Sequence, residues 1–450
     1  MFNKILITNR GEIAARIIRT CQKMGIKTVA IYSEADQNAP HVEQADESYL
    51  IGPPRVNESY LNMEKIIEVA AAANVDAIHP GYGLLSENTE FARKCTENKI
   101  VFIGPSPATI SQMGSKIEAR KLMSQAGVPI VPGTDAPLAD VEEAVREAKI
   151  IGYPIMLKAS AGGGGIGMQR VDDEEALRKA FEGNQKRAKD FFGDGAMFLE
   201  KLILNPRHIE IQLLADKEGN TIYLGERECS IQRRHQKVVE EAPSPFIDEK
   251  TRKEMGGAAV RAAKAIGYEN AGTVEFIMDE QKNFYFLEVN TRLQVEHPVT
   301  EEVTGLDLVE QQIRIANSET LSISQEDVQI NGHAIEVRIY AEDPNTFFPS
   351  PGTISNLSIP SGENIRHELA VKSGSVVTPF YDPMIAKLIV KGHSRNEAIK
   401  NMSEGLEQYI VEGIKTNIPT LKKIVDHPEY IAGNTTTNFI DSFLKAAKVN

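Results

Sequence analysis

Cysteine is scarce in this chain: the three residues Cys21, Cys95 and Cys229 are odd in number and lie far apart. Their spacing fits no cysteine metal site, and such usage is typical of a reducing compartment. Long apolar runs are also missing, because no stretch approaches the roughly 20 residues that a membrane-spanning helix needs. The first eight residues are predicted to form a short strand leading into a helix that contains Glu12, not a secretory leader. We therefore expect a cytoplasmic protein with no membrane partner.

Positive charge is also in deficit. The 50 Lys and Arg residues face 63 Asp and Glu residues, and the resulting net charge of −13 argues against a nucleic-acid partner. Within this acidic background lies one basic run, Arg233-Arg234-His235-Gln236-Lys237. Local positive charge in an acidic protein favours a small anionic ligand, although such a run is also typical of a solvated turn.

The first third of the chain alternates strands with helices, which predicts a parallel, helix-covered α/β sheet. The turn Asn9-Arg10-Gly11-Glu12 after the first strand has only one glycine, so a structural turn is favoured over a dinucleotide-binding turn. The expected strands are 4–8, 27–32, 76–79 and 100–104, and the expected helices are 12–24, 60–73 and 87–97.

The remainder is predicted to mix helices and strands, which makes the overall class α+β, with two to four domains in 450 residues. Residues 106–125 are predicted as one helix that stops at Gly127, and 129–137 as a hinge. Residues 151 to about 225 are predicted as strands, with a hairpin of 208–214 and 221–224. Beyond residue 331 the expected elements are strands at 334–340, 352–359 and 384–390 and a helix at 396–411.

Acidic side chains gather on a predicted hairpin of residues 274–289, whose turn is Gln281-Lys282-Asn283. Glu288 and Asn290 are two positions apart and share one face, which Glu275 on the partner strand can join. Hard oxygen ligands of this kind suit Mg²⁺ or Mn²⁺ beside nucleotide phosphates. The hairpin therefore predicts a metal site.

A solvated acidic face is the plainer explanation of these carboxylates. Arg292, Gln294 and Glu296 follow at alternate positions, however, and a purely solvated strand needs no such mixture. Burying so many ionisable groups is costly unless they hold a metal, an anion or a substrate.

A glycine-rich segment points to phosphate. A strand at 154–160 that carries Lys158 runs into Gly162-Gly163-Gly164-Gly165-Ile166-Gly167 before another strand begins. Glycines let backbone amides wrap an anion. The strand–loop–strand context excludes a Walker loop, which needs Gly-Lys-Ser/Thr opening a helix. A glycine lid over a triphosphate, with Lys158 on a phosphate, remains beside the alternative of a mobile linker.

In combination, these motifs resemble those of biotin carboxylases in the ATP-grasp superfamily, in particular the separate subunits of bacterial acetyl-CoA carboxylases. The resemblance runs in order from about residue 2 to residue 445. No lysine stands in the Ala/Met-Lys-Met setting of a biotinyl carrier, and no carboxyltransferase segment is expected in this chain. The motifs that carry the resemblance are Asn9-Arg10-Gly11-Glu12-Ile13-Ala14, His79-Pro80-Gly81-Tyr82-Gly83, Lys158 with the four glycines, Arg233 to Lys237, and Glu288 to His297.

The resemblance implies three domains: an N-terminal α/β domain (1–114), an ATP-grasp domain with a mobile glycine-loop lid (115–330, lid about 131–204), and a C-terminal β-rich domain (331–450). It also implies that ATP, bicarbonate and biotin on a carrier protein give ADP, phosphate and carboxybiotin through carboxyphosphate. This would be the first half-reaction of acetyl-CoA carboxylase in fatty acid synthesis. The implied partners are the biotin carboxyl carrier protein, the carboxyltransferase subunits and a second copy of the chain, with Arg19 and Arg366 at homodimer-interface positions.

The resemblance also assigns site residues. Four have catalytic roles: Arg292 and Lys237 supply positive charge, Glu296 accepts the bicarbonate proton, and Arg338 stabilises an enolate-like biotin. The nucleotide positions are Lys116, Lys158, Gly163, Gly164, Gly165, Glu200, Lys201, Ile203, His208, Gln232, His235, Glu275 and Glu288. Two Mg²⁺ or Mn²⁺ ions are expected at Glu275, Glu288 and Asn290, bicarbonate at Lys237, Arg292, Gln294, Val295 and Glu296, and biotin at Tyr82 and Arg338.

Each of these residues taken singly has a plainer role. Arg338 could be a strand charge paired with Glu336 or Glu342. Ordinary structural or surface roles are also open to His208, His235, Lys116 and Tyr82. The occurrence of all these residues together in one chain favours the active-site roles over the separate structural ones.

The chain departs from the family pattern at two places. Ile166 stands in the glycine loop where family members often have a basic residue, so a phosphate contact from that side chain is absent. The hairpin from Glu275 to Glu288 is one residue longer than the family pattern.

Other functions stay open. The nearest is the biotin carboxylase component of a pyruvate, propionyl-CoA or other acyl-CoA carboxylase. An ATP-grasp ligase acting on another acid is disfavoured by the intact Arg-x-Gln-Val-Glu run at 292–296. A non-catalytic ATP-binding regulatory paralogue would not need the full set of charged residues, and a dinucleotide-binding protein would need more glycines after the first strand.

Overall fold

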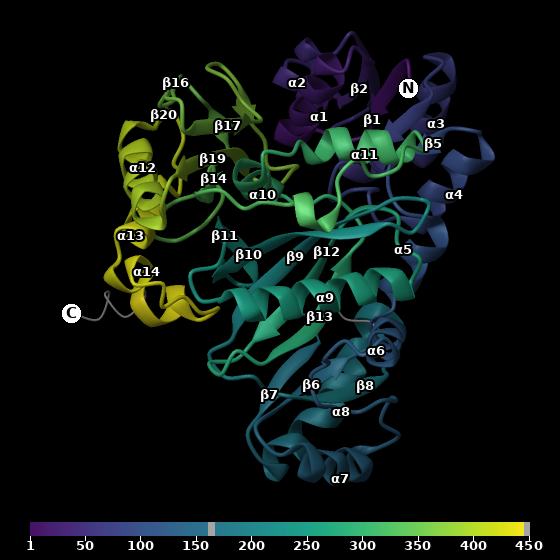
Figure 1. Ribbon diagram of the computed structural model, residues 1–450, viewed down its shortest axis with the longest axis vertical. Coiled ribbons are helices and arrows are strands. Elements are labelled where there is room, and N and C mark those ends of the chain that lie inside the picture. The colour runs from purple at the N-terminus through teal and green to yellow at the C-terminus, as the bar shows by residue number, and fades with distance from the viewer. Residues whose placement is uncertain (161–166, 445–450) are drawn as a thin grey trace.

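The computed structural model describes residues 1–160 and 167–444. Three lobes surround a central sheet: an N-terminal lobe, a small lobe around β6 to β8, and a C-terminal lobe (Figure 1). The predicted mixed α/β class is confirmed.

The N-terminal lobe is built on a parallel sheet in the order β3-β2-β1-β4-β5. On β1, Ile5 and Ile7 pack into one apolar cluster and Leu6 into another, because successive strand side chains point to opposite faces. Both faces are buried, which explains the uninterrupted apolar run of this strand. The elements are β1 (Lys4–Ile7), α1 (Gly11–Lys23), β2 (Lys27–Ser33), α2 (Pro40–Gln44), β3 (Glu47–Gly52), α3 (Met63–Ala72), β4 (Ala77–His79), α4 (Thr89–Glu97) and β5 (Val101–Phe102). The sequence did not predict α2 and β3.

The predicted helix at 106–125 is wrong as a single element. It is divided into α5 (Pro107–Gly114) and α6 (Lys116–Gln125) at Ser115, which is extended and whose side chain accepts a hydrogen bond from the Glu118 amide. Serine is a favoured N-cap because its hydroxyl satisfies a free amide of the first turn. The division places Lys116 at the start of a new helix beside the central sheet.

The central sheet has the strand order β13-β12-β9-β10-β11-β14-β19-β17, and its neighbouring strands are antiparallel. Strands from the predicted ATP-grasp region (β9 to β13) and from the predicted C-terminal region (β14, β17 and β19) therefore belong to one continuous sheet. Its strands are β9 (Arg207–Ala215), β10 (Thr221–Arg233), β11 (Gln236–Ala242), β12 (Asn270–Met278), β13 (Phe284–Asn290), β14 (His333–Tyr340), β17 (Ile365–Leu369) and β19 (Met384–Gly392), with α9 (Glu249–Ala265), α10 (His297–Thr304) and α11 (Leu308–Ala316) beside it.

The small lobe contains β6 (Ile155–Ala159), β7 (Met168–Val171) and β8 (Met197–Lys201), with α7 (Val141–Ile151) and α8 (Glu174–Phe192). The prediction of strands alone over 151–225 is wrong at α8. Asp173 caps this helix through the Ala176 amide, and Leu177 and Phe181, four positions apart, enter the lobe's own apolar core.

The C-terminal lobe packs α12 (Arg395–Gln408), α13 (Ile418–Val425) and α14 (Pro428–Ile431) against β14 and β19 over a large apolar core. The predicted strand at 352–359 is two short strands, β15 (Gly352–Thr353) and β16 (Asn356–Ser358), which pair with β18 (Val376–Val377) and β20 (Ile410–Glu412). The predicted helix at 396–411 ends at 408, before β20.

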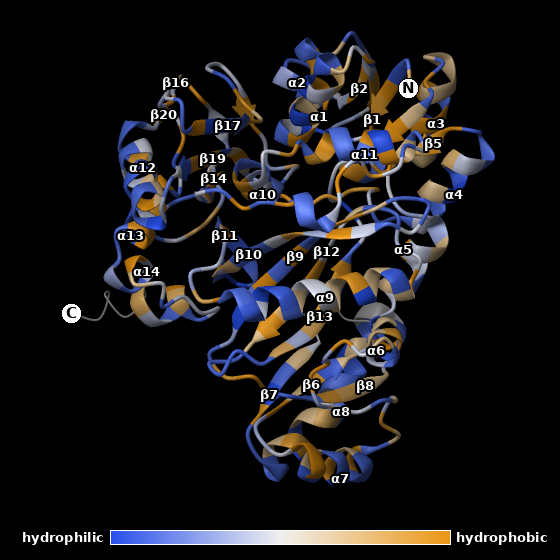
Figure 2. Ribbon diagram, viewed as in Figure 1, coloured by the Kyte–Doolittle hydropathy of each residue, from blue (hydrophilic) through white to orange (hydrophobic). Residues whose placement is uncertain are grey.

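In Figure 2 hydrophobic residues make up much of β1, whereas the helices contain both hydrophobic and hydrophilic residues. Within residues 1–160 and 167–444, none of the helices combines the length and the apolarity of a transmembrane span.

Candidate active site

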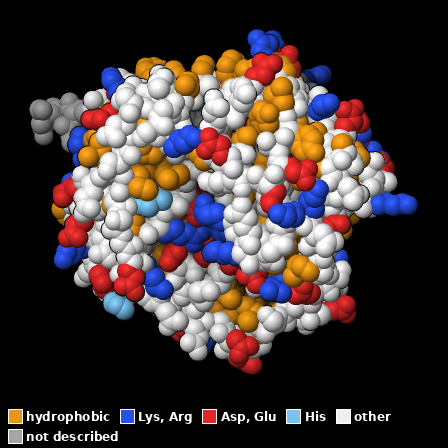
Figure 3. Space-filling view, turned by 90° about the horizontal axis from the view of Figure 1, so that it is seen from above, with side chains coloured by type: hydrophobic (Ala, Val, Ile, Leu, Met, Phe, Trp, Pro, Cys, Tyr) orange, Lys and Arg blue, Asp and Glu red, His pale blue; other side chains and the backbone are white. Residues whose placement is uncertain are grey.

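A cleft of about 1480 Å³ lies where the lobes meet. Figure 3 shows a hollow near the centre of one face, where Lys and Arg side chains gather beside acidic ones. Every predicted site residue that the structure describes lines this cleft. The predicted nucleotide residues Gly163, Gly164 and Gly165, and Ile166 beside them, lie outside the described residues.

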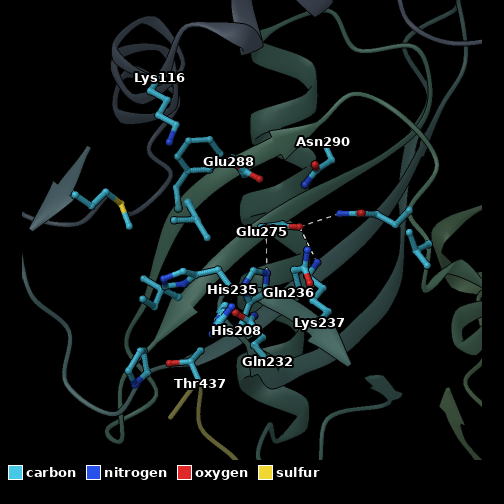
Figure 4. Close-up of a pocket in the computed structure, with 18 of the residues that line it drawn as sticks. Lys116, His208, Gln232, His235, Gln236, Lys237, Glu275, Glu288, Asn290 and Thr437 are labelled. Carbon is cyan, nitrogen blue, oxygen red and sulfur yellow. Dashed lines mark hydrogen bonds and ion pairs between the residues drawn. The ribbon is translucent and has the colours of Figure 1, made fainter. Parts of the chain in front are cut away.

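The predicted metal residues come from the β12–β13 hairpin, as the sequence indicated. Glu275 lies directly opposite Glu288, and Thr273 lies opposite Asn290. The register shifts by one residue between Glu275 and Phe276, so β13 carries one extra residue at Leu287, which is exposed. The bulge turns Glu288 and Asn290 toward Glu275 in the cleft (Figure 4).

The pKa values of Glu275 and Glu288 are shifted in opposite directions by the charges around them. Burial acts to raise the pKa of Glu275, but Lys237 and His208 hold it well below its usual range. His208 Nε2 lies 3.0 Å from Glu275 Oε2. Burial and the charge of Glu275 raise the pKa of Glu288. Two hard carboxylates that repel each other fit a divalent cation between or beside them, with the Asn290 amide as a further oxygen.

Lys237 lies among three carboxylates on the same face of the sheet. Its Nζ donates to Glu210 Oε2 at 2.5 Å, to Glu275 Oε1 at 2.8 Å and to Glu296 Oε1 at 2.6 Å. Burial acts against the ammonium charge, but these carboxylates raise the pKa of Lys237 well above its usual value. The side chain is therefore a permanent cation at neutral pH.

Glu296 is fully buried between Lys237 and Arg338. Arg338 Nη2 donates to Glu296 Oε2 at 3.0 Å, and Arg338 Nε donates to Glu240 Oε1 at 2.6 Å. Burial acts to raise the pKa of Glu296, but the two cations hold it well below its usual range. The carboxylate is thus ionised and can accept a proton. The alternative pairing of Arg338 with Glu336 or Glu342 is wrong, because Glu240 and Glu296 accept its hydrogen bonds.

Arg292 is fixed by three side chains. Its Nε donates to Glu87 Oε2 at 2.8 Å, Nη2 to Asn290 Oδ1 at 2.8 Å and Nη1 to Gln294 Oε1 at 2.9 Å. Gln294 Nε2 in turn donates to Glu275 Oε1 at 2.8 Å. This chain of bonds links the predicted bicarbonate residues to the predicted metal residues.

The predicted nucleotide residues line the other end of the cleft. Lys158 Nζ pairs with Glu200, which also accepts from Arg120 Nη1 at 3.0 Å. Lys201 Nζ donates to the carbonyls of Gly152 at 2.7 Å and Tyr153 at 3.1 Å. Burial lowers the pKa of Lys116, and Glu288 opposes this effect. The cleft is also lined by Ile203, Gln232 and His235.

The basic run has two roles in the structure. Arg234 and His235 form the exposed turn between β10 and β11, with φ of 50° and 66°. Arg233 forms a bidentate pair with Glu342, at 2.9 and 2.8 Å. Of the five residues in the run, Lys237 is the one that contacts Glu210, Glu275 and Glu296.

Tyr82 lies half-buried at the N-terminal wall of the cleft. Its hydroxyl is buried with no hydrogen-bond partner among the described residues. Lys387 Nζ lies 5.9 Å from the ring centroid and donates to the Val295 carbonyl at 2.6 Å.

The predicted interface residues pair within this chain. Arg19 Nη2 contacts Glu368, and Arg366 donates to Glu301 at 2.8 Å and to Glu302 at 3.1 Å. Their interface role stays a prediction.

Sequence reasoning missed several buried charges that support the cleft. Glu210 stands between Ile209 and Ile211 on β9, and Arg227 stands between two glutamates on β10. A charged residue inside an apolar strand was the available signal, because such a group must be paired. Glu240 is a third buried case, whereas the exposed Glu87 and the half-buried Arg120 support the cleft from its margin.

Replacing Arg227 by methionine should strongly destabilise the protein. Arg227 is fully buried, and its guanidinium donates to Glu210 at 2.5 Å, Gln212 at 2.7 Å and Thr300 at 3.0 Å. Leaving Glu210 without this partner should cost about 3–5 kcal/mol. Thermal and urea unfolding of the variant and of an exposed control, Arg93→Met, would measure the difference. Equal midpoints would contradict the role of Arg227.

The arrangement can hold three kinds of group close together. Two carboxylates and an amide suit a divalent cation, lysines suit phosphates, and the Lys237, Arg292 and Arg338 cations suit a small anion beside the ionised Glu296. Fixed charges that need no reorganisation can stabilise a developing anion.

Three family models match the chain. They are described as the N-terminal domain of biotin carboxylase (residues 1–110), the ATP-binding domain of the carbamoyl-phosphate synthase L chain (115–324) and the C-terminal domain of biotin carboxylase (336–442).

Similar proteins agree with these matches. Biotin carboxylase 2 of Bacillus subtilis is 66% identical over 444 residues, 99% of this chain and 100% of the relative. The propionyl-CoA carboxylase alpha chain of Ruegeria pomeroyi is 52% identical over 461 residues, 98% of this chain and 68% of the relative. A solved dimer of the biotin carboxylase domain of Hydrogenobacter thermophilus 2-oxoglutarate carboxylase, in complex with MgADP, ADP and bicarbonate, superposes with a TM-score of 0.93 at 52% identity, covering 98% of this chain and 97% of that one. The chain belongs to the biotin carboxylase family.

Proposed function

We propose that this chain carboxylates biotin at the expense of ATP, with bicarbonate as the carboxyl donor. The observation that carries the proposal is the ionised Glu296 held between Lys237 and Arg338, in the same cleft as the Glu275–Glu288 pair. The relatives support it, since a similar solved structure contains MgADP and bicarbonate.

Bicarbonate is a poor electrophile, so it must first be activated. Glu296 accepts the bicarbonate proton, a bicarbonate oxygen bonds to the γ-phosphorus, and the bond between that phosphorus and ADP breaks. The products are carboxyphosphate and ADP. The carboxyl group then passes to a biotin ring nitrogen, phosphate leaves, and the released phosphate takes up the proton of that nitrogen. Arg292 and Lys237 screen the anions that meet in this step.

The site assignments follow the same proposal. Biotin would lie between Tyr82 and Arg338, and bicarbonate among Lys237, Arg292, Gln294, Val295 and Glu296. The nucleotide would contact Lys116, Lys158, Glu200, Lys201, Ile203, His208, Gln232 and His235. Two Mg²⁺ or Mn²⁺ ions at Glu275, Glu288 and Asn290 would neutralise the transferring phosphate.

Replacing Glu288 by glutamine should weaken the metal dependence of turnover. The change removes one hard anionic ligand and the repulsion that a cation relieves, so saturation should require at least tenfold more Mg²⁺. Initial rates across a Mg²⁺ titration would measure this, with the exposed Glu280→Gln on the same hairpin as control. An unchanged Mg²⁺ requirement would remove Glu288 from the ligand set.

The biological setting of the reaction is also a proposal. We propose the acetyl-CoA carboxylase of fatty acid synthesis, with a biotin carboxyl carrier protein, carboxyltransferase subunits and a second copy of this chain, in a homodimer, as partners. A pyruvate, propionyl-CoA or other acyl-CoA carboxylase is the alternative, because a 52% identical relative is named as the alpha chain of a propionyl-CoA carboxylase. The domain bounds 1–114, 115–330 and 331–450, and a lid at about 131–204, belong to the same proposal.

The direct test is ADP release by the purified protein with Mg²⁺ and ATP. Release that free biotin stimulates and that stops without bicarbonate would support the proposal. Nucleotide binding without such turnover would favour a regulatory paralogue, and turnover with a different acid would favour another ATP-grasp ligase.

A further inference from the structure

Two glutamates face each other next to Arg338. Glu240 on β11 lies directly opposite Glu336 on β14, and both side chains are 0% exposed. Residues opposite each other on antiparallel strands have Cβ atoms about 5 Å apart. Two carboxylates at that separation and away from water disfavour double ionisation, because neither burial nor a like charge stabilises the anion.

Most oxygens of this pair lack a donor. Glu240 Oε1 accepts from Arg338 Nε at 2.6 Å. Glu240 Oε2 and both oxygens of Glu336 are buried without a hydrogen-bond partner among the described residues. Buried polar atoms are rarely left unpaired. One proton on the pair would turn one oxygen into a donor and satisfy an oxygen of its neighbour.

Neighbouring elements do not supply the missing donors. Lys387 on β19 is opposite Arg338, but its Nζ donates to the Val295 carbonyl and lies 3.4 Å from Glu12. The next row along the strands is apolar, with Ala242 opposite Ala334 beneath Val299 and Val303 of α10. The charged or titratable groups that interact with the pair are Arg338, Lys387, Glu296, Lys237, Cys229, Tyr340 and Tyr430.

Electrostatics agree with this geometry. Burial raises the pKa of Glu240 to about 7, with Arg338 acting in the other direction. Burial raises the pKa of Glu336 well above its usual value, with Lys387 opposing and Glu240 adding to the shift. Burial also keeps the pKa of His297 well below its usual range, so its imidazole stays neutral and adds no cation.

We propose that Glu240 and Glu336 share one proton and act together as a positioning unit for Arg338. The ionised oxygen of Glu240 orients the guanidinium, while the shared proton leaves one negative charge on the pair. Arg338 then faces two carboxylate charges, from the pair and from Glu296, instead of three, so the surroundings of the guanidinium repel another anion less. The identity of that anion as an enolate-like biotin rests on the proposed function.

Infrared difference spectroscopy tests the shared proton without any assay of activity. In Glu336→Gln the amide takes the place of the protonated carboxyl group, and Glu240 stays ionised. The wild-type-minus-variant spectrum at pH 7 should therefore contain the C=O stretch of a protonated carboxyl and no net carboxylate band. A difference that contains a carboxylate band instead would overturn the proposal.

Three further variants complete this measurement. In Glu240→Gln the protonated Glu336 remains, so the spectrum of Glu240→Gln minus that of Glu240→Gln/Glu336→Gln should contain the same protonated-carboxyl band, which keeps the test decisive if Glu336→Gln fails to fold. The exposed Glu404→Gln is the matched control, and it should show only the loss of a carboxylate band because that residue is in contact with water.

Kinetics test the positioning role separately. Glu240→Gln should raise the KM for free biotin and lower kcat by about tenfold, while the KM for ATP stays within about twofold. The double variant Glu240→Gln/Glu336→Gln removes both carboxyl groups and should lose at least as much as Glu240→Gln, whereas Glu336→Gln, which keeps the ionised Glu240, should lose less. Equal effects on biotin and ATP would contradict positioning. Absence of biotin carboxylation by the wild type, with the expected infrared bands, would contradict only the proposed function.

Discussion

Replacing Arg338 by glutamine should lower carboxybiotin formation by roughly 10²-fold or more while ATP binding stays near wild type. The guanidinium lies at the end of the cleft proposed for biotin and is held by Glu240 and Glu296. Its loss removes a fixed cation from the place where the biotin anion would develop. The residues proposed to bind the nucleotide are elsewhere in the cleft, so their contacts should be unchanged.

The same change should alter the pH profile. Arg338 helps hold the pKa of Glu296 well below its usual range, so its removal raises that pKa. Glu296 then loses its charge at a higher pH than before, and the acidic limb of the rate profile should move toward higher pH. The exposed Arg93→Gln is a matched control. Unchanged carboxylation in Arg338→Gln would remove Arg338 from the mechanism.

Replacing Lys237 by glutamine should have a still broader effect, with kcat reduced by about 10³-fold. Its ammonium is the common partner of Glu210, Glu275 and Glu296. Without it, three neighbouring carboxylates repel each other, and the screening of bicarbonate and phosphate that we propose for Lys237 would be lost. The change should also destabilise the fold by about 3–5 kcal/mol, because buried carboxylates keep no compensating cation.

Rates and unfolding midpoints measured from pH 6 to pH 9 would check this prediction. Loss of Lys237 raises the pKa of Glu296 and of Glu275, so any remaining activity should increase with pH over a higher range than in the wild type. The exposed Lys65→Gln should leave both quantities unchanged. A Lys237→Gln variant with near-normal kcat would contradict the central role of this cation.

Local patterns in the sequence were sufficient to predict which site residues lie close together on the β12–β13 hairpin. The turn after Met278 and the alternation along β13 placed Glu275, Glu288 and Asn290 together, and the structure confirms that placement. Strand and hairpin patterns are short-range signals, because they depend on residues a few positions apart. Their roles as metal ligands stay a prediction.

Long-range pairing explains what the sequence did not show. Arg338 contacts Glu240, which is 98 positions away, since β14 lies beside β11. No local pattern specifies that neighbour, so the nearby Glu336 and Glu342 were considered instead. Glu87 and Arg292, 205 positions apart, are a second case.

The division of the predicted helix at 106–125 and the unpredicted helix α8 both have local causes. At Ser115 a capping serine inside a helical pattern starts a new helix, and the capping signal was weaker than the surrounding periodicity. At α8 the prediction followed the glycine-rich segment and the strands beside it. The helix signals, which are the Asp173 cap and the spacing of Leu177 and Phe181, were not recognised.

Isotope transfer from bicarbonate tests the central claim most directly. The protein would be given Mg²⁺, ATP, free biotin and bicarbonate labelled with both ¹⁸O and ¹³C. If bicarbonate attacks the γ-phosphorus, one ¹⁸O should appear in the released phosphate for each ¹³C-carboxyl group found on biotin. Phosphate without ¹⁸O, or ADP release without labelled carboxybiotin, would contradict the account.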